Sequence, residues 1–266
     1  MRIGIAVFSV ASIASGILDL IWGELEPAHQ PLQAWGNHIF GITIIAYVIA
    51  VWLVVGGAAL LWQKTLRFGA AALTILYGIF VLFPLPRFVT APHFLGYRPA
   101  VYIGVTGNIC EQVILFVAAA VAWGWFAARG SRTRKQASAV RWIFGLCPVF
   151  FGLGNLTAIQ TVVPMIPKWM PFGPTFWAVL TGIAFVMAGL AIISGVLDVL
   201  GARLLGTMLL VFSALVLTPP ILTSPRDHVS WGANTFNLTV VGAAWIMADW
   251  LGDRKQPARS PQRTTQ

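Results

Sequence analysis

The segment PMIPKWMPFGP (residues 164–174) places four prolines within eleven residues and leads directly into a long apolar run. Because proline lacks an N–H and clashes with the preceding helical turn, this segment cannot lie inside one helix. The run that follows, residues 175–200, is long enough to cross a bilayer. Trp169 and Lys168 suit the headgroup level, where tryptophan concentrates and lysine extends its ammonium to water. We therefore predict a rigid loop at the membrane surface, followed by a spanning helix.

The composition excludes a soluble fold. Of 266 residues, 58% are hydrophobic and only 9% are charged, and the mean hydropathy is +0.81. Soluble domains carry about 25% charged residues. The apolar runs predict an all-α membrane protein with eight transmembrane helices. These helices are expected at residues 1–22, 38–62, 68–83, 99–128, 142–163, 175–200, 204–217 and 229–251.

Basic residues set the expected orientation. If the charged stretch 129–141 is cytoplasmic, that side holds thirteen Lys and Arg residues, and the other side holds four: Arg87, Arg98, Lys168 and Arg226. Because cytoplasmic loops are enriched in cations, both termini are predicted to be cytoplasmic. The bias also explains the net charge of +9 without a nucleic-acid partner. The expected location is the cell membrane, with the lipid bilayer as the partner.

The two halves of the chain share one layout. Each has a third helix, expected to be short, that ends at a proline pair, Pro84 with Pro86 and Pro219 with Pro220. We predict two tandem four-helix bundles related by a pseudo-two-fold axis along the membrane normal. The expected divisions are a first repeat at 1–128, a basic cytoplasmic linker at 129–141, a second repeat at 142–251 and a disordered basic tail at 252–266.

Two stretches of the second half, IPKWMPFGPTFW (166–177) and LTGIAFVMAGLA (180–191), resemble the DoxX-like membrane family. The first half is similar only in layout. The resemblance implies a four-helix unit with a proline-rich outer loop. It also implies a redox-associated membrane subunit, linked to quinone or to thiol and sulfur chemistry at the outer face, with a soluble redox enzyme as a partner. It implies no set of catalytic residues.

One face of the fourth predicted helix carries the polar group whose insertion into the bilayer costs the most free energy. Glu111 is expected about 18 Å into that helix, and Asn108 and Gln112 share its face at helical spacing. Because a charge at that depth is expensive, the face must point into the bundle. Asn234 and Asn237 are its counterparts in the second half. One interpretation is a polar core that carries protons or contacts a quinone; the other is a neutral Glu111 acting as structural glue.

The histidines and Asp19 form a second candidate group at the outer face. His29, His38, His93 and His228 all lie in or beside outer loops. They could bind a metal ion or a quinone headgroup, or be solvated interfacial side chains. Asp19 lies about one turn from the outer end of the first helix, where it can meet water or Arg98. Haem is disfavoured because no histidine is placed within a predicted helix core.

Three functions stay open at this point. The first is the redox-associated subunit. The second is a small-solute or proton-coupled transporter that uses Glu111 and Asn237, and the third is a structural or assembly protein with no catalytic site. Cys110 and Cys147 have no C-x-x-C or metal-ligand spacing and are expected to be inert buried thiols.

Overall fold

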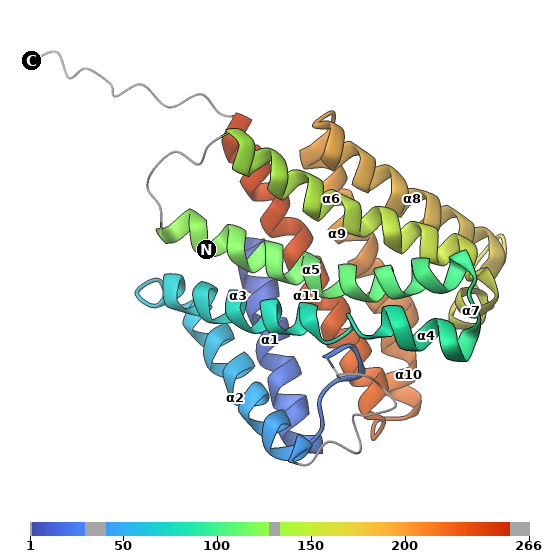
Figure 1. The fold of residues 1–266 in the computed structure, drawn as a ribbon, viewed down its shortest axis with the longest axis horizontal. Helices are drawn as coiled ribbons and strands as arrows, with labels where there is room; N and C mark the ends of the chain where they lie inside the picture. The colour runs from blue at the N-terminus through green and yellow to red at the C-terminus, as the bar shows by residue number, and fades with distance from the viewer. Residues whose placement is uncertain (1, 30–40, 128–133, 256–266) are drawn as a thin grey trace, which may run out of the picture.

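A computed structural model describes residues 2–29, 41–127 and 134–255, and every regular element in these ranges is helical (Figure 1). The predicted all-α class is confirmed. The long helices are α1 (Ile3–Trp22), α2 (Ile42–Leu61), α3 (Leu66–Leu82), α5 (Pro99–Ala127), α6 (Arg134–Thr157), α8 (Pro174–Ser194), α9 (Asp198–Phe212) and α11 (His228–Lys255). The short elements are η1 (Pro27–His29), α4 (Arg87–Leu95), α7 (Ile159–Val162), η3 (Val163–Met165), the π-helical η4 (Ser213–Leu217) and α10 (Thr218–Thr223).

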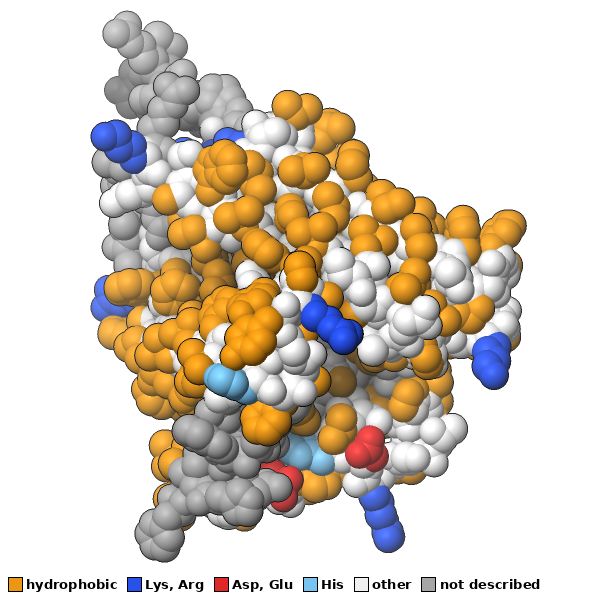
Figure 2. All heavy atoms as spheres, turned by 45° about the vertical axis from the view of Figure 1, so that its right-hand side comes forward, with side chains coloured by type: hydrophobic (Ala, Val, Ile, Leu, Met, Phe, Trp, Pro, Cys, Tyr) orange, Lys and Arg blue, Asp and Glu red, His pale blue; other side chains and the backbone are white. Residues whose placement is uncertain are grey.

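Seven helical stretches in the described ranges are long and apolar enough to cross a bilayer. They are Ile3–Trp22, Ile42–Leu61, Leu66–Leu95, Pro99–Trp125, Lys135–Thr157, Pro174–Ser194 and Asp198–Thr223. Hydrophobic side chains cover most of the face shown in Figure 2, and charged groups are few on it. The chain is therefore a multi-pass helical membrane protein. The eighth expected crossing, α11, is not among the seven; it packs against α1, α5 and α9.

The long helices pack in chain order and close into a ring. Each packs against the next long helix, α11 packs back against α1, and α5 contacts α11 across the ring. Each helix can be exchanged for its counterpart in the other half, for example α1 for α6 and α5 for α11. The set of helix contacts is then unchanged. The division into two repeats stays a prediction, and this packing order supports it.

Close helix contacts repeat at equivalent places in the two halves. A Cβ added to Gly16 of α1 would lie 2.5 Å from the Ala50 carbonyl oxygen of α2. One added to Gly152 of α6 would lie 2.4 Å from the Gly182 carbonyl oxygen of α8. Small residues let membrane helices approach this closely. Both halves thus use small residues at the joint between their first two helices.

The two ends of the described chain lie together. Arg2 forms an ion pair with Asp253 at 2.6 Å, and a Cβ on Gly4 would lie 2.6 Å from the Ile246 nitrogen. The start of α1 therefore packs beside the end of α11, and both ends of the helical ring are at the same side of the molecule (Figure 1).

The helices predicted at 68–83 and 204–217 correspond to α3 and α9, but helical structure continues beyond each of them. The stretch expected as a loop after Pro86 contains α4, and the membrane-span candidates run through the prolines to Leu95 and Thr223. Pro86 is the N-cap of α4, and Pro219 lies in the first turn of α10. A helix tolerates proline there because the missing N–H has no intrahelical partner. The prolines mark joints between helices rather than ends of the spans.

Other boundaries also differ from the prediction: for example, the fifth expected helix ends at Thr157 instead of residue 163. The sixth expected helix ends at Ser194 instead of residue 200, because Gly195 adopts a left-handed conformation with φ of 78° and terminates α8. Asp198 consequently begins α9. The predicted linker is helical from Arg134 onward, and α11 extends into the predicted tail as far as Lys255.

Candidate functional site

A short segment after α1 is buried inside the helical ring. Leu25, Glu26 and His29 are 2%, 1% and 2% exposed, although the sequence predicted a polar surface loop from residue 25. Two hydrogen bonds hold the segment. The Glu26 backbone N–H donates to Asp19 Oδ1 at 3.0 Å, and Gln112 Nε2 donates to the Ala28 carbonyl oxygen at 2.8 Å. Asp19 and Gln112, both predicted site residues, thus hold the segment in place.

A cavity of about 370 Å³ lies beside this segment. Its polar lining consists of Glu26, Arg87, Asn108 and Glu111, and its apolar lining is Pro27, Ala28, Pro84, Leu217, Val229, Ala233 and Phe236. The predicted inward orientation of Asn108 and Glu111 therefore agrees with the structure. Glu26 and Arg87 were not among the predicted site residues. Arg87 could have been selected from the sequence, because it is one of four cations expected on the outer side.

The acidic groups of this site have unequal surroundings. Burial, followed by the nearby Asp19 carboxylate, raises the pKa of Glu26 well above its usual value of 4.5. The Ser15 hydroxyl donates to Glu26 Oε2 at 3.2 Å. Glu111 instead has the Arg87 guanidinium as its electrostatic partner. The cavity thus combines a carboxyl that favours the neutral form with a second carboxyl that has a guanidinium nearby.

Two of the predicted histidines are buried next to these acids. His29 stacks on Phe80 with ring centroids 4.2 Å apart, and its Nδ1 lies 3.6 Å from Glu26 Oε2. Burial lowers the pKa of His29 to about 3, so the imidazole is neutral. His228 stacks on Trp22 at 5.0 Å, and its Nε2 lies 3.7 Å from Asp19 Oδ1. The interpretation of these two side chains as solvated was wrong, because the segment at residues 25–29 and the start of α11 both fold inward.

Several buried polar atoms around this segment have no hydrogen-bond partner within the described part of the chain. They are Asp19 Oδ2, both ring nitrogens of His29, Gln112 Oε1 and His228 Nε2. Most buried polar groups in proteins are hydrogen-bonded, and an unpaired one costs about 1–3 kcal/mol. Their concentration around one short segment marks it as a place where further hydrogen-bonding groups would be stabilised.

The other two predicted histidines do not join this site. His93 is exposed on α4, and its Nδ1 lies 3.3 Å from the Tyr97 hydroxyl. His38 lies outside the described residues. Across the ranges that the structure describes, no group of three His, Cys, Asp or Glu side chains could hold a metal ion. The histidines are thus not gathered into a common site there.

No protein-family model matches this chain. No curated protein and no solved structure is significantly similar to it either. The DoxX-like resemblance accordingly stays a prediction, and the functional argument depends on the geometry of the site.

The asparagines of α11 have a structural role. Asn237 Nδ2 donates to the Leu209 carbonyl oxygen at 2.8 Å and to Ser213 Oγ at 2.9 Å. Ser213 Oγ in turn donates to Asn234 Oδ1 at 2.7 Å. These bonds tie α11 to α9 and to the π-helical turn η4, and neither asparagine lines the cavity. Asn237 therefore does not share the lining of this cavity with Glu111.

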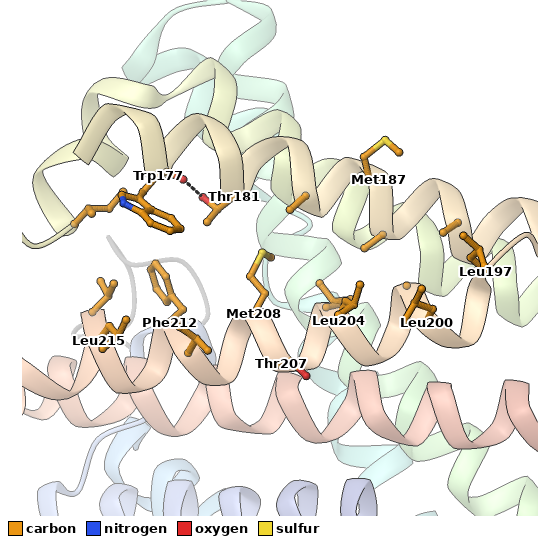
Figure 3. A pocket seen from close by; sticks show the side chains of 18 of the residues that line it. Trp177, Thr181, Met187, Leu197, Leu200, Leu204, Thr207, Met208, Phe212 and Leu215 are labelled. Carbon is orange, nitrogen blue, oxygen red and sulfur yellow. Dashed lines mark hydrogen bonds between the residues drawn. The ribbon is translucent and has the colours of Figure 1, made fainter. Parts of the chain in front are cut away.

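A second hollow is an apolar groove of about 580 Å³ between α8 and α9. Figure 3 shows Met208 and Phe212 of α9 directed toward α8, with Trp177 at one end of the groove. The equivalent joint between α2 and α3 is tight, since a Cβ on Gly69 would lie 2.4 Å from the Leu60 nitrogen. The groove therefore distinguishes the second half from the first, but its lining has no charged group to orient a reactant.

The two cysteines lie together, which their spacing did not predict. Cys110 and Cys147 are both buried and free, and the Cys147 thiol lies within hydrogen-bonding reach of Cys110. The Cys147 thiol also donates to the Ile143 carbonyl oxygen at 3.3 Å. Both residues belong to the hydrophobic core of the ring, away from the lining of the polar cavity.

Proposed function

We propose that the chain is a redox-associated membrane protein that binds a quinone headgroup in the cavity formed by Glu26, Arg87, Asn108 and Glu111. The observation that supports this is the cavity itself, which places hydrogen-bond donors beside exchangeable carboxyl protons within a membrane protein. The Arg87 guanidinium, the Asn108 amide and a protonated Glu26 can each donate to a quinone oxygen. Phe236, Pro27 and Pro84 offer apolar surface to the ring.

The charges of the cavity favour a neutral ligand. Two carboxyl groups and one guanidinium line it, and with Glu26 protonated the charges of Arg87 and Glu111 offset each other, so an anion such as thiosulfate would meet no net positive charge. A quinone is neutral, and its reduction to a quinol takes up two protons and two electrons. In this proposal Glu26 and Glu111 relay protons, and a soluble redox enzyme at the outer face supplies the electrons.

The proposed topology has eight crossings, with α11 as the eighth, and both termini in the cytoplasm. The pairing of Arg2 with Asp253 supports an even number of crossings, because the two ends share one side. The basic residues support the cytoplasmic assignment. Glu26 and Arg87 then lie toward the outer leaflet, where a lipid-soluble quinone can approach past Val229, which is 56% exposed.

A transporter is the weaker alternative. It requires a polar path from the cavity to the cytoplasmic side. Near the buried segment, Tyr77 and Phe8 pack edge to face with centroids 5.6 Å apart, and both are fully buried. Ile114 and Leu115, which follow Glu111 on α5, are also fully buried. These apolar contacts favour a site that is closed toward the cytoplasm.

The test is the binding of a short-chain ubiquinone to the purified full-length protein, followed by intrinsic fluorescence. Arg87→Gln removes a charged donor, which typically contributes about 1.5–3 kcal/mol, so we expect the Kd to rise by about 10- to 100-fold. Arg98→Gln is the matched control, because Arg98 is an exposed cation outside the cavity lining. Wild-type protein without saturable binding, or equal binding by the two variants, would overturn the proposal.

A further inference from the structure

A second polar cavity, of about 510 Å³, lies at the opposite end of the first half. Arg2 at the start of α1 lines it, together with Gln63, Lys64 and Arg67 from the turn between α2 and α3. Ile5, Leu61 and Leu66 form its apolar part. No acidic side chain belongs to this lining, so the cavity collects three cations where the proposed topology places the cytoplasmic surface.

The three cations are only partly neutralised. Arg2 pairs with Asp253 at 2.6 Å and lies over the Trp125 ring, 3.6 Å from its centroid. Lys64 and Arg67 have no carboxylate within 4.0 Å among the described residues. Like charges held together repel one another, and an anion between them relieves this repulsion. The cavity is therefore suited to a negatively charged group.

The second half has an arginine at the equivalent position of its first helix. There Arg141 of α6 donates from Nε to the Ile192 carbonyl oxygen at 3.1 Å and from Nη2 to the Ile193 carbonyl oxygen at 2.7 Å. The correspondence of Gly16 with Gly152 places Ile5 of α1 at the position of Arg141. In the first half, an apolar side chain thus stands where the second half has a guanidinium, and the cavity lies beside it.

We propose that this cavity binds the phosphate group of an anionic phospholipid from the cytoplasmic leaflet. The start of α3 at Leu66 adds the favourable end of a helix dipole. Trp62 and Phe68 flank the turn and are 68% and 60% exposed, so acyl chains can lie on the adjacent outer surfaces of α2 and α3. Basic pockets between membrane helices at the cytoplasmic side are known to suit anionic headgroups.

The test measures the thermal stability of the purified full-length protein in detergent, with three additions in separate titrations. Phosphatidylglycerol should raise the Tm saturably, because a ligand that binds only the folded state stabilises it. Phosphatidylcholine with the same acyl chains, and inorganic phosphate alone, should not. The double variant Lys64→Gln/Arg67→Gln should bind phosphatidylglycerol about 30-fold more weakly, as expected for the loss of two cations near a membrane surface.

The double variant Lys135→Gln/Lys168→Gln is the matched control, since both lysines are exposed and lie outside the cavity. It should respond as the wild type does. Ile5→Arg should abolish the response without removing a cation, because Ile5 lines the cavity and the longer side chain would occupy it. Equal responses of the two double variants, a full response of Ile5→Arg, or a shift with phosphate alone would each overturn the proposal. None of these outcomes bears on quinone binding.

Discussion

Glu26 and His29 predict opposite effects of pH on the stability of this protein. Burial raises the pKa of Glu26 well above 4.5, so its contribution to stability is present below pH 4.5 and is lost as the pH rises through the folded value. Burial lowers the pKa of His29 from 6.5 to about 3, so its contribution is present above pH 6.5 and is lost as the pH falls.

The magnitude follows from the linkage of protons to folding. Between pH 4.5 and 6.5, His29 raises the free energy of unfolding by about 1.4 kcal/mol for each pH unit. Glu26 lowers the free energy of unfolding at the same rate while the pH lies between its unfolded and folded pKa values. The two contributions therefore oppose each other in the wild type. Relative to wild type, His29→Phe should lose about 2 kcal/mol across this range, and Glu26→Gln should gain stability as the pH rises. Phenylalanine suits the site because Phe80 and Phe236 already surround the imidazole.

The assay is unfolding of the purified protein in mixed detergent micelles at pH 4.5, 5.5 and 6.5. Glu24→Gln is the control for Glu26→Gln, since Glu24 is exposed two residues away, and its curves should follow the wild type. Variants of Glu26 and His29 that both follow the wild type, or that diverge from it in the same direction, would refute the buried arrangement of the segment.

Three further substitutions test the packing. Gly242→Ala should lower the free energy of unfolding by about 3 kcal/mol, because its Cβ would lie 2.4 Å from the Phe8 nitrogen, whereas Gly104→Ala meets nothing within 4 Å and should be neutral or stabilising; similar unfolding curves would contradict the helix contact. Arg141→Gln loses two hydrogen bonds to the end of α8 and should cost about 2 kcal/mol in the same assay, and unchanged stability would count against this cap. Asn237→Leu should destabilise the protein by about 1–3 kcal/mol yet keep the quinone Kd, and a weakened Kd would show that the asparagine acts on the ligand site.

Much of the helical architecture could be predicted from local sequence patterns. Long apolar runs predict membrane helices regardless of what they pack against, and the spacing of Asn108 and Glu111 correctly predicted an inward face. The prolines predicted the end of α3 correctly but not the short helices that follow them, because proline is disfavoured inside a helix and tolerated in its first turn. Pro86 and Pro219 lie at the starts of these short helices.

The burial of the segment after α1 could not be predicted from local patterns in the same way. A glutamate and a histidine within a few residues of a proline resemble a surface loop, and only distant partners make their burial tolerable. Asp19 and Gln112 supply these contacts, and the hydrogen bond from Gln112 joins positions 84 residues apart. Likewise, Asn237 and Glu111 occupy matching positions in the two halves but differ in their contacts, because Asn237 donates a hydrogen bond to Ser213 in η4.

The closure of the ring through α1 and α11 has a consequence for biogenesis. The ion pair that joins these helices links residues 251 positions apart, so α1 leaves the ribosome long before its partner exists. Until α11 is inserted, Asp19 must be sheltered by the translocon or by a chaperone, because acyl chains cannot solvate a carboxyl group. A nascent chain halted before α11 should therefore be retained by the insertion machinery or degraded by membrane quality control.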